Sequence, residues 1–85
     1  MTDKQSFSYP DDAPLKDRVL SVIRLLKQPT VHEIAAEIVE LQGIASEEGV
    51  AECTTNIEEV LKQLWEAGAI ETHSDNGKDR YKLNQ

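Results

Sequence analysis

Hydrophobic residues recur at helical spacing in three segments of this chain. The first segment contains these apolar positions at i, i+4, i+7, i+8 and i+11: Leu15, Val19, Val22, Ile23 and Leu26. Such spacing is typical of a helix with one buried face. The helix is predicted to begin near Pro14, where the missing N–H of proline does no harm, and to end before Pro29. Leu20 and Leu25 lie off the buried face, so this helix has more apolar surface than one core requires.

A second helix is predicted to begin directly after Thr30. Thr30 and Glu33 have the spacing of a capping box, in which the hydroxyl and the carboxylate satisfy backbone N–H groups reciprocally. Gly43 is the expected end of this helix, since glycine adopts the left-handed conformation that terminates many helices. Its inward face is predicted to consist of Ile34, Ile38 and Leu41, with Ala35 and Val39 alongside.

Between residues 42 and 53 the helical periodicity fades, because glycine, serine and glutamate interrupt the apolar positions. This pattern predicts a loop, with or without a single helical turn. Thr55 and Glu58 repeat the capping spacing, so the third helix is predicted to run from Thr55 to about Ala67, with Gly68 ending it. Trp65 lies at the edge of its apolar face, which consists of Ile57, Val60, Leu61 and Leu64.

Asn76-Gly77 predicts a β-hairpin with a two-residue type I′ turn, since both turn positions require a positive φ. The register that follows from this turn has these pairs: Ile70 with Leu83, Glu71 with Lys82, Thr72 with Tyr81, His73 with Arg80, and Asp75 with Lys78. The apolar pairs then share one face, and the charged pairs join opposite signs. A shift by one residue would destroy both matches.

Three helices followed by a hairpin predict an α+β, mostly helical domain over residues 14–85. A chain of 85 residues buries one modest core, so a single domain is expected. Residues 1–13 mix serine, aspartate, glutamine and proline with two isolated aromatics, which is typical of an extended arm. Two interpretations of the arm stay open: an unordered tail, or a segment that docks Phe7 and Tyr9 onto the body or a partner.

Composition and charge narrow the classes of function. The chain is 39% hydrophobic and 29% charged, in the globular range, and its start has neither a signal-peptide nor a transit-peptide pattern. A cytoplasmic protein without a membrane span is therefore predicted. Cys53 is the single cysteine, which excludes an internal disulfide and favours a small buried apolar role. The net charge of −7 resides mostly in residues 15–85, so duplex DNA would be repelled overall.

The order of elements resembles the winged helix-turn-helix superfamily over residues 15–84. The sequences that carry the resemblance are Thr30-Val31-His32-Glu33-Ile34-Ala35 and Leu64-Trp65-Glu66-Ala67-Gly68-Ala69-Ile70. In that family the third helix usually enters the major groove and the hairpin wing contacts phosphates. The resemblance implies DNA contacts from Thr54, Thr55, Asn56, Lys62, Gln63, Lys78 and Arg80. Asn56 and Gln63 would bond adenine edges, and Lys62 a guanine or a phosphate.

Two features depart from the family pattern and favour another partner. The stretch between the second and third helices exceeds the usual tight turn, and the face that would read DNA holds Glu59 and Glu66 against Lys62 alone. Among the basic residues of the predicted hairpin, Lys78 and Lys82 each face a carboxylate on the other strand, and only Arg80 remains without one. The alternative hypothesis is an acidic protein–protein interaction module, with an interface formed by Leu20, Leu25 and Trp65 and a homodimer through the first helix. DNA binding and protein binding both stay open at this level.

The sequence contains no motif that indicates a catalytic site or a metal site. His32-Glu33 begins like a zinc-protease helix, but the second histidine would have to be residue 36, which is alanine. His73 is far from His32 in the chain, and no phosphate loop, nucleophile elbow or convergent carboxylate pair is found. We therefore predict a non-enzymatic binding module with no catalytic residue, no metal and no cofactor. The many glutamates after residue 46 are either an acidic docking surface or a solvated face.

Overall fold

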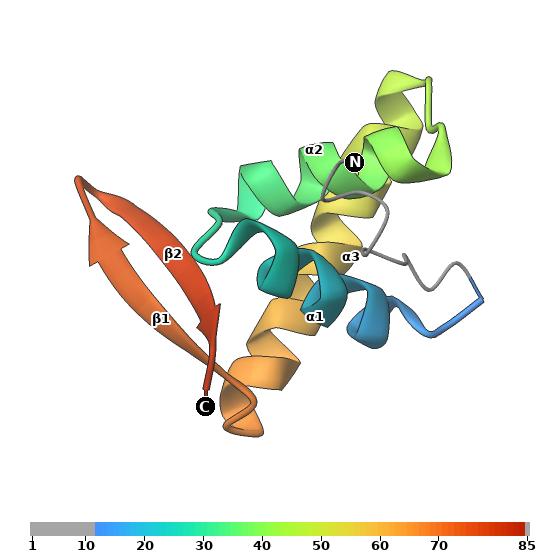
Figure 1. The fold of residues 1–85 in the computed structure, drawn as a ribbon. Coiled ribbons are helices and arrows are strands. Elements are labelled where there is room, and N and C mark those ends of the chain that lie inside the picture. Colours follow the sequence, from blue (N-terminus) through green and yellow to red (C-terminus); the bar gives the residue numbers. More distant parts are fainter. Residues whose placement is uncertain (1–11, 85) are drawn as a thin grey trace, which may run out of the picture.

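The structure is a computed structural model that describes residues 12–84, so the expectations for Phe7 and Tyr9 lie outside the described residues. It contains α1 (Leu15–Leu26), α2 (Val31–Gln42), α3 (Glu47–Glu66), β1 (Ile70–Asp75) and β2 (Lys78–Leu83). Figure 1 shows the hairpin beside the three helices, with its turn pointing away from them. The predicted α+β, mostly helical class is confirmed, and the layout is consistent with a winged helix.

Helix α1 begins after Pro14 and buries one face, as its spacing predicts. Val19, Val22 and Ile23 are fully buried, and Leu20 is half-buried and packs against the same core. Helix α1 therefore exposes less apolar surface at Leu20 than its helical pattern predicts. Leu25 is also half-buried.

Helix α2 is fixed at both ends by the predicted caps. The Thr30 amide donates to the Glu33 carboxylate at 2.8 Å, and the Glu33 amide donates to the Thr30 hydroxyl at 3.2 Å, so the capping box is confirmed. Gly43 ends the helix in the left-handed conformation, with φ of 68°. The prediction that Leu41 faces the core is wrong, because it lies in the last turn of α2, outside the buried cluster, and is 38% exposed.

Helix α3 begins at Glu47, so the predicted loop over residues 42–53 and the predicted start at Thr55 are wrong. The Ser46 side chain caps the helix by accepting a hydrogen bond from the Gly49 amide at 3.0 Å. Glutamates at positions 47 and 48 also favour the start, because acidic side chains near a helix N-terminus interact well with its dipole. The connection between α2 and α3 is thus confined to residues 43–46. It is therefore shorter than the sequence pattern predicts, and its length no longer sets the chain apart from the winged-helix pattern.

The hairpin has the predicted register at every pair from Ile70–Leu83 to Asp75–Lys78. Its turn residues have positive φ, 53° at Asn76 and 79° at Gly77, as a type I′ turn requires. Beyond the hairpin, the Tyr81 amide donates to the Pro29 carbonyl at 2.9 Å, and Thr30 forms an isolated bridge with Arg80. Strand β2 is therefore fixed to the turn between α1 and α2.

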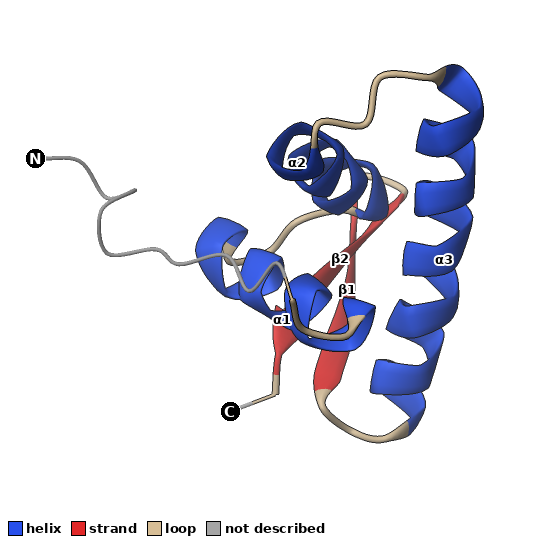
Figure 2. Cartoon of the chain, turned by 90° about the vertical axis from the view of Figure 1, so that its right-hand side faces the viewer, coloured by secondary structure: helices blue, strands red, loops and turns tan. Residues whose placement is uncertain are grey.

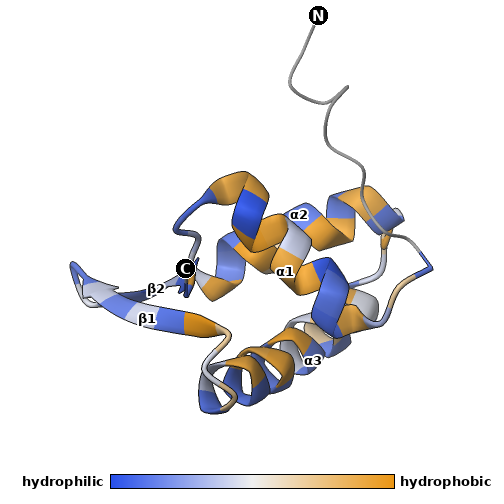
Figure 3. Cartoon of the chain, turned by 60° about the horizontal axis from the view of Figure 1, so that its bottom comes forward, coloured by the Kyte–Doolittle hydropathy of each residue, from blue (hydrophilic) through white to orange (hydrophobic). Residues whose placement is uncertain are grey.

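One hydrophobic core lies between the three helices and the base of the hairpin. Figure 2 shows α3 running along one side of the domain, with α1 and α2 on the other and the strands behind the helices in this view. Figure 3 shows apolar colouring along the helices and largely hydrophilic colouring on the hairpin. No helix within residues 12–84 is long and apolar enough to cross a membrane. The buried apolar residues are Val19, Val22, Ile23, Ile34, Ala35, Ile38, Ile57, Leu61, Leu64 and Ile70.

Candidate functional site: the exposed face of α3 and the groove beside α2

The residues that the resemblance assigns to DNA lie on two elements. On α3, Thr55, Asn56, Lys62 and Gln63 are exposed, as the prediction requires. Thr54 is half-buried and its hydroxyl donates to the Val50 carbonyl at 2.9 Å within the same helix. Lys62 borders a small hollow between α3 and the hairpin, which Trp65, Thr72 and Tyr81 also line. The other predicted contacts, Lys78 and Arg80, belong to β2.

The exposed face of α3 is strongly acidic. It contains six glutamates against a single lysine, Lys62, and all seven side chains are exposed. A phosphate backbone approaching this face would meet like charge, whereas a cationic partner would be attracted. The six glutamates are Glu47, Glu48, Glu52, Glu58, Glu59 and Glu66.

Arg80 is held by three groups, so the prediction that it lacks a carboxylate partner is wrong. Its guanidinium donates to the Gln28 carbonyl at 2.8 Å and to the Asp75 carboxylate at 3.2 Å, and it lies 3.5 Å from the Glu33 carboxylate. The bridge between Thr30 and Arg80 brings the guanidinium over the start of α2, where these partners meet. Arg80 therefore joins the hairpin to the helices, and Asp75, predicted to face Lys78 alone, contributes to that joint.

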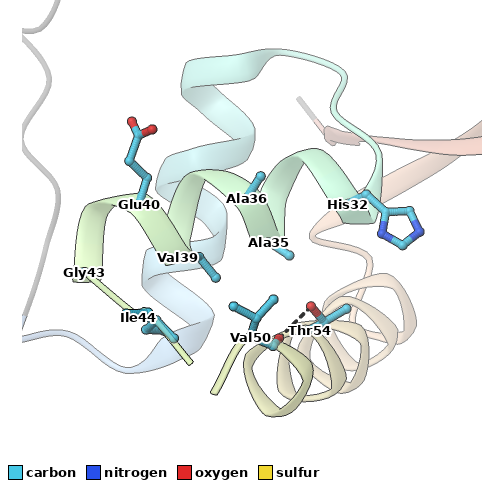
Figure 4. A pocket seen from close by; sticks show the side chains of 10 residues that line it. His32, Ala35, Ala36, Val39, Glu40, Gly43, Ile44, Val50 and Thr54 are labelled. Atoms are coloured by element: carbon cyan, nitrogen blue, oxygen red, sulfur yellow. Dashed lines mark hydrogen bonds between the residues drawn. The ribbon is translucent and has the colours of Figure 1, made fainter. Parts of the chain in front are cut away.

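A groove with a volume of about 650 Å³ lies between α2, the connection that follows it and the start of α3. Figure 4 shows Val39, Ile44 and Val50 pointing toward one another across this groove, with His32 and Glu40 toward its outside. Val50 is 36% exposed, although it is a large apolar residue. We call this feature the α2–α3 groove, and it is lined by His32, Ala35, Ala36, Val39, Glu40, Gly43, Ile44, Ala45, Val50 and Thr54.

A second hollow of about 310 Å³ continues the α2–α3 groove across the outer face of α2. The two hollows share Ala36 and Glu40, and the second is also lined by Leu26, Glu33 and Glu37. Among the described residues, none of those that line either hollow is a lysine or an arginine. This surface thus combines an apolar floor with carboxylates at its border.

Cations gather on a different side of the domain. Arg24, Lys27 and Lys82 border a hollow of about 330 Å³ at the end of α1, together with Gln28 and Leu83. Lys82 also lies 3.7 Å from the Glu71 carboxylate, which confirms that predicted cross-strand pair. The charges of the domain are therefore segregated, with α2 and α3 acidic and the end of α1 basic.

Cys53 is half-buried and packs against the core, so it is less enclosed than predicted. Burial raises the pKa of its thiol above the ordinary value, and the nearby positive charge of Arg18 partly offsets this. Both residues line a hollow of about 280 Å³ with Gln42, to which the Arg18 guanidinium donates a hydrogen bond. Within residues 12–84, no three histidine, cysteine, aspartate or glutamate side chains are grouped to hold a metal ion.

The predicted apolar interface residues are distributed over two helices. Trp65 on α3 is 54% exposed, whereas Leu20 and Leu25 on α1 are half-buried. The homodimer through α1 stays a prediction. The sequence does not predict the groove, because Ile44 and Val50 fall in the segment whose pattern indicates a loop.

Comparison of the chain with protein-family models, with curated proteins and with solved structures gave no match.

Proposed function

We propose that this domain is a non-enzymatic interaction module of the winged-helix type that binds a positively charged segment of another protein. The observation that carries the proposal is the charge of α3, the element that would enter the major groove in a DNA-binding relative. Six exposed carboxylates on this helix oppose binding to phosphates and favour binding to lysine and arginine.

The hairpin supports the same conclusion. In a DNA-binding winged helix the wing supplies cations to the phosphate backbone. Here Arg80 is engaged by Gln28, Glu33 and Asp75, and Lys82 lies beside Glu71. Using Arg80 for a phosphate would weaken contacts that hold the hairpin to the helices, and using Lys82 would weaken its cross-strand pair with Glu71.

A direct competition between the two kinds of partner tests this function. The full chain is titrated by fluorescence anisotropy with a labelled lysine-rich peptide and with a labelled mixed-sequence DNA duplex, at the same ionic strength. We expect the peptide to bind more tightly than the duplex. Reversing charge on α3, as in Glu59→Lys, should weaken peptide binding, because the attraction comes from that surface. Nanomolar, sequence-selective duplex binding at physiological salt would overturn the proposal.

A second candidate function is weak association with DNA, and the basic end of α1 is the observation that favours it. Arg24, Lys27 and Lys82 lie together there, on a side that is separate from the acidic face of α3. Such a contact would position the domain on phosphates without reading bases, since phosphate contacts carry no direct sequence information.

A further inference from the structure

We infer that the α2–α3 groove is the docking site for an amphipathic helix of a partner protein, with aliphatic side chains in the groove and lysine or arginine at its border. This inference rests on the proposed protein-interaction function and specifies both its site and its partner. Helix-in-groove recognition of this kind uses apolar anchors spaced along one helical face.

The floor of the groove suits aliphatic side chains. Ala35 is small and buried on the side of α2 that faces α3, and Ala36 is small and exposed at the border beside Glu40, so a partner helix approaches α2 closely. Val39, Ile44 and Val50 supply apolar walls. Ile34 and Ile38 are fully buried in the core, which anchors the α2 side of the groove. A volume of about 650 Å³ falls in the range of preformed ligand sites.

The wall formed by Ile44 is held in place by the start of α3. A side chain at position 49 would come within 2.8 Å of Ile44 Cγ2, so glycine there lets Ile44 pack directly over the first turn of α3. The Ile44 amide also donates to the Val39 carbonyl at 3.0 Å, which joins the connection to α2. The groove is therefore formed before a partner arrives, and binding loses little conformational entropy.

Charge identifies the partner as cationic. Glu40 borders the groove, and Glu37 borders the hollow that continues it. Glu33 in the same hollow is already bonded to the Thr30 amide and lies near Arg80, so Glu37 and Glu40 are the carboxylates left to attract a partner. Lysine or arginine beside the aliphatic anchors would match them.

A second copy of this chain fits the groove less well than a different protein does. The basic helix that a second copy could offer is α1, which contains Lys16, Arg18 and Arg24. However, the apolar face of α1 is occupied, because Val19 and Val22 are fully buried in its own core. A partner helix whose apolar face is free meets both requirements of the site.

The experiment uses the full chain and a labelled amphipathic helical peptide of leucine, alanine and lysine, with binding followed by anisotropy. Glu40→Lys should weaken binding at least about tenfold, whereas Glu59→Lys, the same charge change on α3 outside the groove, should weaken it by only about threefold. Ala36→Gln should also cost about tenfold by blocking the close approach of the partner helix at the border of the groove, and Ala51→Gln on the exposed surface of α3 is its matched control. A peptide with serine in place of leucine should bind much more weakly.

A measurement that needs no variant accompanies these titrations. Amide chemical shifts of the unmodified chain should change most at Val39, Ile44 and Val50 when the peptide is added. Changes concentrated at the end of α1 would overturn the groove as the site. Thermal unfolding of each variant identifies any that lose structure.

The outcomes separate this inference from the function on which it rests. Equal losses from Glu40→Lys and Glu59→Lys, with no effect of Ala36→Gln, would overturn the groove and leave α3 as the binding surface. No binding of the peptide by the unmodified chain would overturn both proposals. Self-association in sedimentation that Ala36→Gln abolishes would show that the occupant is a second copy and would overturn the assignment to another protein.

Discussion

Gly49 occupies a position where the lack of a side chain decides the local structure. It lies in the first turn of α3, where a Cβ atom would be 2.8 Å from Ile44 Cγ2 and 2.9 Å from the Ser46 hydroxyl. Helix propensity alone predicts that alanine at this position would stabilise the chain by about 1 kcal/mol. The close contacts oppose that gain, because they involve the cap of α3 and the wall of the groove.

Gly49→Ala should therefore lower the free energy of unfolding by about 1 kcal/mol, because an overpacking cost of about 2 kcal/mol exceeds the gain in helix propensity of about 1 kcal/mol. Urea denaturation followed by circular dichroism measures the change. Comparing Ile44→Ala with the double variant Gly49→Ala/Ile44→Ala provides the control, since the smaller side chain relieves one of the two contacts and should reduce the loss. A gain in stability from Gly49→Ala alone would show that the first turn of α3 is looser than described.

Cys53 should react slowly with iodoacetamide in the folded domain. Burial raises the pKa of its thiol, so the reactive thiolate forms at higher pH than in a free cysteine. The neutral thiol is favoured by folding, and its contribution to stability is full below the ordinary thiol pKa and is lost as the pH rises through the folded-state value. Alkylation rates against pH, with the urea-unfolded chain as control, check this. A profile that coincides with the unfolded chain or lies at lower pH would contradict it.

Among the elements, those with local stereochemical signals were predictable from the sequence. The capping box of Thr30 and Glu33 located α2, and Asn76-Gly77 fixed the hairpin register, because few other residues satisfy those geometries. The start of α3 was misplaced because Gly49 resembles a loop residue unless its neighbours in space are known. Ser46, Glu47 and Glu48 are residues typical of a helix N-terminus. However, the apolar residues have regular helical spacing only after Thr55, and this favours the later start.

Ser46→Ala and Thr55→Ala form a matched pair that tests where α3 begins. Removing the Ser46 cap should cost about 1 kcal/mol of unfolding free energy, because the Gly49 amide loses its acceptor. Thr55 lies inside the helix and is exposed, so alanine there should be neutral or slightly stabilising. Thermal unfolding of both variants gives the comparison. The reverse order of effects would mean that residues 47–54 are not helical in solution.

Across the whole molecule, the candidate site was predictable in its charge but not in its shape. The acidity of α3 is visible in the sequence, since six glutamates and one lysine fall between Ser46 and Ala67. The contacts of Arg80 with Gln28 and Glu33 are not visible in the sequence, because both residues lie far from Arg80 in the chain. The bridge between Thr30 and Arg80 brings them together. The α2–α3 groove likewise depends on helix packing, which no local pattern specifies.

Binding to duplex DNA should be weak and governed by salt. The basic end of α1, together with Lys62, offers about two to four phosphate contacts, so the slope of log K against log salt should be between about −1.8 and −3.6. Fluorescence titration of a mixed-sequence duplex at two salt concentrations measures this slope. Arg24→Ala should lower affinity more than Lys62→Ala, because Lys62 is surrounded by the glutamates of α3. A larger loss from Lys62→Ala would assign the contact to α3.

The hairpin described above has two unequal edges. Residues 29 and 30 cover the outer edge of β2 near Arg80 and Tyr81, whereas the outer edge of β1 has no such neighbour within the described residues. An open strand edge is a template for pairing with other chains, and charged side chains such as Glu71 and Asp75 discourage that pairing. Replacing the charged residues of β1 with valine or isoleucine would raise its strand propensity and stabilise the hairpin slightly. The same replacement would make β1 pair with other chains, so the protein would tend to form fibrous aggregates.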